Sequence, residues 1–401
     1  MNSPEKESFF NPRQSNLNQT VFFILLACLI FALVLFLTRP IAHGYRYDLV
    51  LKLTIELLLV WLIFSSDPGW LSKRGIIIVI LIAGLALAFY QLSTINPEAE
   101  VIESYNTVFK DLEEGRNPYT SGRIYHRDES GQVVYQNFNY FPLELYPYWF
   151  FYRVFKVWNM QALSLLLISL QFLAVLIMVL TFRKIKKSYF LVFLPLIVFS
   201  EIKTTAAMTM LMLAIFVALL FAQERTPSTP KRLLLAVVIG LGLLTKFLFI
   251  PIAAVYYLQR LDFRSWKNFF QVFSEGLVSI AVALSLMVPF GLSNVIKSTI
   301  LFNLNLGERN LYTTFYPNIL SGVFYLIKLP ELYPVAAVVI MIAVVLAVVG
   351  LPIFTGIMIS IITFLLVSPT PEPQYFGTVL LLALAAKMRE LYWQKEIVLL
   401  A

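Results

Sequence analysis

Charged side chains are scarce in this sequence, and their scarcity decides the class of protein. Asp, Glu, Lys and Arg make up 13% of the 401 residues, against about 25% in an average soluble domain. Hydrophobic residues make up 59%, and the mean hydropathy is +0.78. This composition excludes an ordinary soluble domain and predicts a polytopic, all-α membrane protein.

Residue types that bind metals or form disulfides are equally rare. The single cysteine, Cys28, excludes an intrachain disulfide framework and a CxxC site. The two histidines, His43 and His126, are too few for a zinc site without an acidic ligand pattern beside them. We therefore expect no metal and no cofactor. A divalent cation held by loop carboxylates is the alternative.

Positive charge is in excess, because 31 Lys and Arg residues stand against 23 Asp and Glu residues, a net charge of +8. A basic protein can bind nucleic acid. Here, however, the cations occupy short loops between apolar runs, as the orientation signals of membrane proteins do. We expect membrane lipids as partners and no nucleic acid.

Long apolar runs indicate the membrane spans. A bilayer core of about 30 Å needs about 20 apolar residues per helix, and open sheets cannot lie in it. The first run is longer than a signal-peptide core and lacks a small-residue cleavage site, so we expect a retained span. The clear runs are Val21–Leu37, Leu49–Phe64, Gly75–Leu92, Ala162–Phe182, Thr204–Ala222, Val272–Leu292, Val335–Gly350 and Leu351–Val367.

Clusters of Lys and Arg predict which loops are cytoplasmic. The strongest are Arg183–Lys187, Gln223–Arg232 and Gln259–Lys267. The apolar segment Leu233–Leu258 between two inner clusters then forms two short helices with Lys246 near the outer bend; one tilted span is the alternative. About 12 crossings result, with both termini cytoplasmic. We expect one membrane domain over residues 1–401, in the plasma membrane.

One outer loop, residues 93–160, concentrates the polar chemistry. Its stretch Ser93–Leu145 carries nine acids against four bases. Pro97 favours a helix start and Gly115 ends this helix, whose apolar face predicts a surface-lying helix. That face comprises Val101, Tyr105, Val108, Phe109 and Leu112. The aromatic, proline-broken segment Tyr140–Trp158 indicates a second interfacial element.

The order of these segments resembles a known family. An acid-bearing helix ending in GRNPY (Gly115–Tyr119), followed by YFPLELY (Tyr140–Tyr146), is similar to the first outer loop of GT-C membrane glycosyltransferases. It is most similar to glycosyltransferase family 87, the polyprenyl-phosphate-mannose-dependent mannosyltransferases. LLTKFLFIP (Leu243–Pro251) and PEPQYFGTVLLLALA (Pro371–Ala385) extend the likeness. The sequence departs from the family at Val101, where the family has Asp, and in two spans that precede the family's first.

The resemblance implies a GT-C-type helical bundle that transfers a sugar, mannose, with inversion from a polyprenyl-phosphate donor to a lipid or glycan acceptor outside the membrane. Such chemistry needs a base and cations for the departing phosphate. Glu103 is the first candidate base and Glu100 the second. We expect Lys246, Arg309 and Lys203 to bind the donor phosphate. Substrate contacts are expected from Tyr105, Asn117, Tyr119, Tyr140, Glu372 and Tyr375.

Other interpretations stay open. The acids also fit solvated or helix-start charges, and the lysines fit snorkelling side chains at the membrane boundary. A lipid-linked oligosaccharide polymerase or ligase would use similar outer loops and donors. A transporter or flippase would show internal repeats and polar groups near the midplane, whereas polarity here is concentrated in one outer loop.

Overall fold

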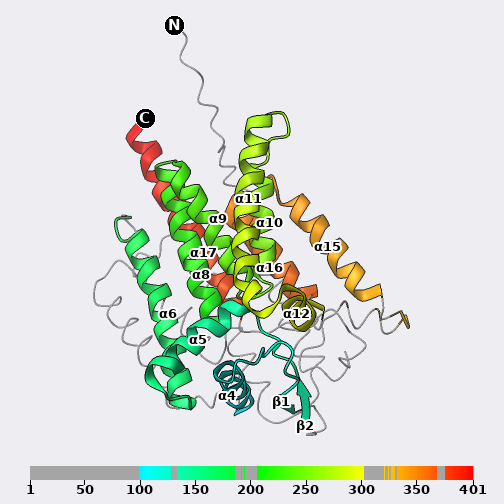
Figure 1. The fold of residues 1–401 in the computed structure, drawn as a ribbon. Helices are drawn as coiled ribbons and strands as arrows, with labels where there is room; N and C mark the ends of the chain where they lie inside the picture. The colour runs from blue at the N-terminus through cyan, green and yellow to red at the C-terminus, as the bar shows by residue number, and fades with distance from the viewer. Residues whose placement is uncertain are drawn as a thin grey trace.

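The computed structural model describes residues 99–127, 133–185, 206–301, 332–367 and 375–400, together with a few single residues between 191 and 329. Figure 1 shows a bundle of helices with a small layer of helices and strands at one end. The described helices of the bundle are α6 (Met160–Phe182), α8 (Ala206–Arg225), α9 (Thr229–Leu243), α10 (Phe249–Arg260), α11 (Trp266–Met287), α15 (Tyr333–Ala347), α16 (Ile353–Val367) and α17 (Phe376–Leu400).

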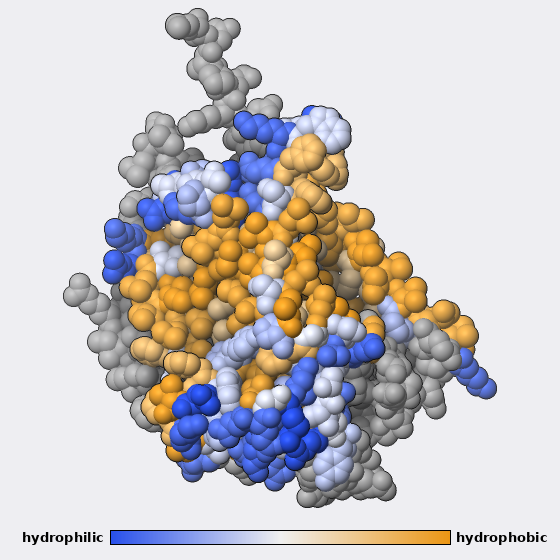
Figure 2. Space-filling view, in the orientation of Figure 1, coloured by the Kyte–Doolittle hydropathy of each residue, from blue (hydrophilic) through white to orange (hydrophobic). Residues whose placement is uncertain are grey.

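The layer at the end of the bundle is formed by the predicted outer loop. It contains α4 (Ala99–Glu113), β1 (Ile124–Arg127), β2 (Val133–Gln136) and α5 (Pro142–Phe155). We call its described residues, 99–127 and 133–155, the cover. The end of the bundle beneath it is the cover end, and the opposite end is the far end. On the face in Figure 2, polar residues gather at both ends and an apolar belt lies between them.

Three stretches of the described chain are long and apolar enough to cross a bilayer: Gln161–Phe182, Ala206–Arg225 and Trp266–Phe290. Apolar runs therefore predicted α6 and α8 closely, and α15 and α16 also match their runs. Helix α11 begins before its predicted start because Ser265 caps it, accepting a hydrogen bond from Asn268 N at 3.3 Å. The first three apolar runs lie outside the described residues, so the 12 crossings stay a prediction.

The predicted bend at Lys246 is confirmed. Helices α9 and α10 are separate and antiparallel, and residues 244–248 turn between them. The turn is closed by Thr245, whose hydroxyl donates to Gly242 O at 2.7 Å. A Cβ at Gly242 would lie 2.2 Å from the ring of Phe249, so the turn requires glycine there. A tilted single span is excluded.

Helix α4 ends as the sequence predicts. Gly115 has φ +70°, Arg116 N donates to Asp111 O at 2.7 Å, and Gly115 N donates to Leu112 O at 3.3 Å. This pair of hydrogen bonds is a Schellman motif, which satisfies carbonyls in the last turn of a helix. The motif turns the chain back toward the bundle.

Two expectations for the cover were wrong. The apolar face of α4 was expected at the membrane surface, but Tyr105, Val108 and Phe109 are buried at 0–1% exposure and pack on aromatic residues of the protein, including Trp158. Periodicity reveals an apolar face but not what covers it. The segment after Tyr140 was expected to break at its prolines, yet α5 runs through Pro147. The antiparallel pair β1–β2 was not predicted.

The bundle helices differ in how much neighbouring protein surrounds them. The apolar window of α8, which packs between α6, α9 and α17, is 72% buried, whereas that of α11 is 28% buried. Helix α15 lies apart from α11 in Figure 1 and exposes Val335, Val339 and Ile342. Two kinds of apolar helix are therefore present, one covered by protein and one with a large exposed apolar face.

Candidate functional site

A buried ion pair joins the cover to the bundle. Glu144 of α5 is fully buried, and its Oε2 lies 3.3 Å from Nζ of Lys246 in the α9–α10 turn. The same Nζ lies 4.4 Å from the centroid of the Tyr140 ring. Beside this pair, the rings of Phe141 and Phe247 are 5.0 Å apart between centroids. The cover is thus held to the α9–α10 turn by charge and by aromatic packing.

The local sequence explains why Glu144 is at this place. Phe141 is extended, as a residue before proline prefers, and Pro142 begins α5 with no N–H to lose. Glu144 therefore falls in the first turn of α5, where the helix dipole favours a negative charge. The lysine then neutralises a carboxylate that solvent does not reach.

Tyrosines surround this carboxylate. Tyr105 and Tyr148 are fully buried, with ring centroids 4.8 Å apart. Burial, and after it the charge of Glu144, raise the pKa of Tyr148 well above the usual value for tyrosine. Burial also raises the pKa of Tyr105, with smaller contributions from Tyr148 and Glu144. Both tyrosines are therefore neutral phenols, and within the described part of the chain neither hydroxyl has a hydrogen-bond partner.

A second junction ties the cover to the end of α11 and to the short segments that follow it, η3 (Val288–Phe290), α12 (Leu292–Val295) and η4 (Ile296–Leu301). Asn117 Nδ2 donates to Phe290 O at 2.5 Å, and Ser298 Oγ donates to Tyr119 O at 2.9 Å. Tyr146 OH donates to Leu286 O at 3.3 Å. The cover is therefore anchored at two places on the bundle.

The GRNPY segment uses its polar atoms within the protein. Asn117 Oδ1 accepts from Tyr119 N at 3.0 Å, and Tyr119 OH donates to Tyr140 O at 2.9 Å. Arg116 Nε lies 3.0 Å from Oδ1 of the buried Asp111, and Arg123 Nη1 lies 3.3 Å from the same oxygen. These contacts show a structural role for the segment, and the substrate roles of Asn117 and Tyr119 stay predictions.

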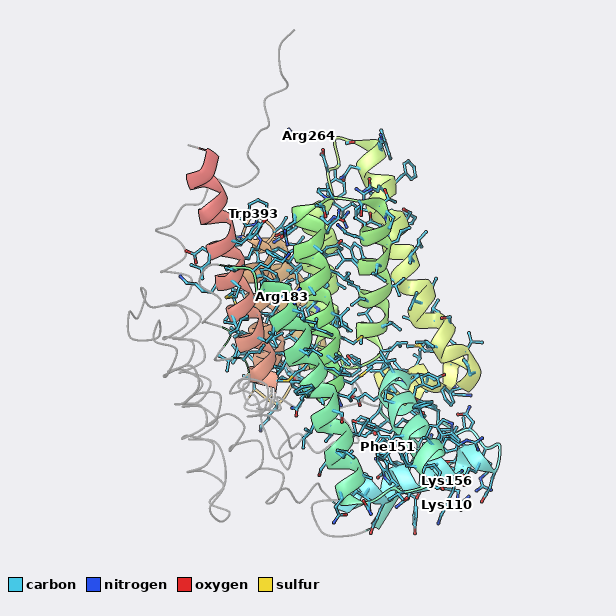
Figure 3. All side chains as sticks on the ribbon, turned by 90° about the vertical axis from the view of Figure 1, so that its left-hand side faces the viewer. Lys110, Phe151, Lys156, Arg183, Arg264 and Trp393 are labelled. Atoms are coloured by element: carbon cyan, nitrogen blue, oxygen red, sulfur yellow. The ribbon has the colours of Figure 1, made fainter. Side chains whose placement is uncertain are left out.

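The predicted bases lie on α4. Glu103 is exposed, and its carboxylate has no ion-pair or hydrogen-bond partner among the described residues. Glu100 belongs to the first turn of the same helix. Lys246 is thus paired with Glu144 and not with Glu103. In Figure 3, Lys110 of α4 and Lys156 lie at the cover end, while Arg264 and Trp393 lie at the far end.

Some of the other predicted site residues are described by the structure, and some lie outside its described ranges. Tyr375 is buried at the start of α17, and Tyr105 and Tyr140 stack at 6.2 Å between centroids. Lys203, Arg309 and Glu372 lie outside the described residues. No group of three His, Cys, Asp or Glu side chains in the described ranges could hold a metal ion. The absence of a cofactor therefore stays a prediction.

Sequence reasoning missed the importance of Glu144. It counted Glu144 only as one acid of the outer loop, yet the signal was present. Glu144 is the single charge in the aromatic segment YFPLELYPYWFF, and Lys246 is the single charge in LLTKFLFIP. Lone charges in apolar segments are usually paired when buried, and these two pair with each other.

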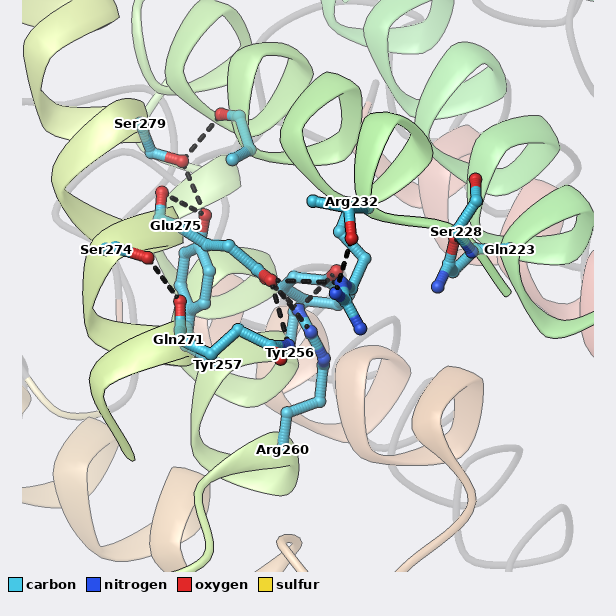
Figure 4. Close-up of polar contacts among 12 residues, drawn as sticks. Gln223, Ser228, Arg232, Tyr256, Tyr257, Arg260, Gln271, Ser274, Glu275 and Ser279 are labelled. Atoms are coloured by element: carbon cyan, nitrogen blue, oxygen red, sulfur yellow. Dashed lines mark hydrogen bonds and ion pairs between the residues drawn. The ribbon is translucent and has the colours of Figure 1, made fainter. Parts of the chain in front are cut away.

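A second buried carboxylate lies at the far end (Figure 4). Glu275 of α11 is 3% exposed and contacts Arg260 of α10 through both terminal nitrogens, with Nη2 at 3.2 Å. Arg232 of α9 places Nε 3.4 Å from the same carboxylate, and Gln271 donates to it at 3.3 Å. Nearby, Ser279 Oγ donates to Ala236 O at 2.6 Å. One carboxylate therefore connects three helices.

Comparisons with known proteins add no relative. No family model, no curated protein and no solved structure matches the chain.

Proposed function

We propose that the protein transfers a sugar, mannose by its resemblance to family 87, from a polyprenyl-phosphate donor to a lipid or glycan acceptor at the cover end. The observation that carries this proposal is the Lys246–Glu144 pair, which puts a lysine where the bundle meets the cover. A phosphate on a lipid chain needs such a place, since its tail requires an apolar surface and its head requires a cation.

Lys246 is the donor-phosphate ligand in this proposal. Its side chain keeps 14% exposure while that of Glu144 has none, so the lysine is the less buried member of the pair. Lysine presents a compact charge on a flexible stem and suits a phosphate approached from the membrane. The apolar belt in Figure 2 offers a surface for the polyprenyl chain.

The base comes from α4, with the exposed Glu103 first and Glu100, in the first turn, second. The carboxylate takes the proton of the acceptor hydroxyl, and the oxygen attacks the anomeric carbon opposite the phosphate. The carbon–oxygen bond to the phosphate breaks, and its electron pair leaves with the phosphate, which Lys246 stabilises. Attack from the opposite face inverts the anomeric configuration.

Radiolabelled donors test the proposal directly. Purified protein is incubated with a panel of polyprenyl-phosphate sugars and a membrane lipid extract, with and without chelator. We expect label to move from donor to an acceptor in both conditions. No covalent transfer from any monosaccharide donor would overturn the proposal. Transfer only from diphosphate-linked oligosaccharides would support a polymerase or ligase, and donor translocation without a new bond would support a flippase.

Variants of α4 test the base. Glu103→Gln is expected to lower transfer at least a hundredfold, because general-base catalysis typically contributes about 10²–10⁴. Glu113→Gln is the matched control on the same helix, since Glu113 contacts Lys156 at the surface of the cover. If Glu103→Gln transfers sugar at a near-normal rate while Glu100→Gln loses transfer, Glu100 is the general base. Normal transfer by both variants would remove the base from α4.

A further inference from the structure

We propose that Glu144 is a positioning residue. Its carboxylate holds the Lys246 ammonium at a fixed place beside the cover, where the ammonium meets the departing phosphate. This inference rests on the proposed function. It adds a second acid to the site with a role different from that of the base. The geometry points to it because the acid is on α5 and the lysine is in a turn of the bundle.

The burial of the two partners sets their roles. Glu144 has 0% exposure, so it cannot reach an acceptor hydroxyl and does not act as the base. Its Oε2 lies 3.3 Å from the Lys246 ammonium, and the lysine side chain as a whole retains 14% exposure. In this inference a phosphate oxygen reaches the partly exposed Lys246 side chain, while the buried Glu144 carboxylate holds the ammonium in place.

Neighbouring groups reinforce this arrangement. The Tyr140 ring lies against the ammonium at 4.4 Å, and its carbonyl accepts from Tyr119 OH at 2.9 Å. Tyr105 and Tyr148 are buried neutral phenols, and the Glu144 charge contributes to the raised pKa of both. Lysine has a long flexible stem, so removing the carboxylate removes one of the contacts that hold its ammonium in place.

Charge adds a distinctive consequence. Glu144 competes with the donor for the same ammonium, since both are anions. Removing the carboxylate therefore strengthens the binding of a phosphate, but it also releases the Lys246 ammonium from its position beside the cover. We expect binding and turnover to change in opposite directions, which loss of structure alone would not produce.

The binding test uses a polyprenyl monophosphate without sugar as the probe and the corresponding polyprenol as its phosphate-free control. Wild-type protein is expected to bind the phosphate at least tenfold more tightly than the polyprenol, and Lys246→Met to lose that difference. Glu144→Gln is expected to bind the phosphate severalfold more tightly than wild type. Polyprenol affinity is expected to be equal in all three proteins.

The turnover test measures sugar transfer by the same proteins. Glu144→Gln is expected to lower kcat at least tenfold without raising KM. Glu144→Asp keeps the charge on a shorter stem and is expected to fall between Glu144→Gln and wild type. Glu113→Gln is the control, because it removes an acid from a cover ion pair that is partly exposed.

The outcomes separate this inference from the proposed function. If wild-type protein does not prefer the phosphate to the polyprenol, the assignment of Lys246 and the proposed function both fail. If Lys246→Met loses the preference but Glu144→Gln matches wild type in binding and turnover, only the positioning role fails. Should Glu144→Gln not fold, Glu144→Asp decides: unchanged kcat overturns the role, and reduced kcat with unchanged phosphate affinity supports it.

Discussion

Among the described residues, a glutamate is buried at each end of the bundle, but the two are neutralised differently. At the far end, Glu275 meets two arginines and a glutamine, and it joins three helices of the bundle. At the cover end, Glu144 comes from the cover and meets a lysine of a turn. Arginine binds a carboxylate through two nitrogens in a fixed geometry, whereas lysine offers a point charge that other anions can share.

This difference separates a structural ion cluster from a candidate functional one. The Glu275 carboxylate is bonded from α9, α10 and α11, so its partners cannot turn to a ligand without loosening the bundle. Lys246 belongs to a five-residue turn between two helix ends and can shift with less disturbance. Burial of an acid alone therefore does not mark a functional site, and the kind of cation beside it is informative.

The largest effect is expected from Glu275→Gln. Removing one partner of a buried ion pair typically costs about 3–5 kcal/mol, and here two arginines lose their carboxylate. We expect the free energy of unfolding to fall by about 4 kcal/mol in SDS titration of mixed micelles. Glu224→Gln, which removes the Arg389 pair between α8 and α17, is a control with a smaller expected loss. Equal losses would contradict a special role for Glu275.

A double-mutant cycle at the cover end is next in size. Lys246→Met leaves the fully buried Glu144 without its lysine and is expected to cost about 3 kcal/mol. The double variant Glu144→Gln with Lys246→Met removes both charges and is expected to lose less than Lys246→Met alone. The same SDS titration measures the coupling energy. If the losses in Glu144→Gln and Lys246→Met add up to the loss in the double variant, the two side chains do not interact.

Helix α9 connects the two ends, and a smaller effect is expected there. A Cβ at Gly240 would lie 2.4 Å from Ser279 O of α11, so Gly240→Ala forces the two helices apart. We expect a loss of about 2 kcal/mol by the same titration. The control is Gly276→Ala, whose Cβ would meet nothing within 4 Å. A loss as large for the control would show that chain flexibility, and not packing, sets the effect.

The smallest effect is expected from alkaline pH at the cover end. Because burial raises the pKa of Tyr105, Tyr119 and Tyr148, their neutral form is favoured in the folded protein. Stability is retained below the pKa of unfolded tyrosine, about 10, and is lost as pH rises above it. In an alkaline pH titration that records phenolate absorbance and unfolding together, we expect these tyrosines to ionise only when the cover unfolds. Tyr105→Phe is expected to reduce the alkaline loss.

The sequence predicted the features that depend on short-range patterns. Apolar runs located α6 and α8, flanking charges located the bend at Lys246, and Gly115 located the end of α4. The strands β1 and β2 escaped prediction because four residues each give too little alternation. Glu144 escaped because its partner is distant in the chain, and composition alone cannot pair two lone charges.

Helix α8 has a consequence for how mutations distribute. It is apolar on all sides and largely enclosed by other helices, so lipid solvation constrains it less than interior fit does. Enlarging Ala207 or Ala214, both with no exposure, would demand displacement of neighbouring backbones. Swapping one exposed aliphatic residue for another on α15, such as Val335 or Val339, would disturb no neighbouring helix to the same degree. Helices α8 and α15 are both strongly apolar, yet α8 tolerates far fewer substitutions than α15.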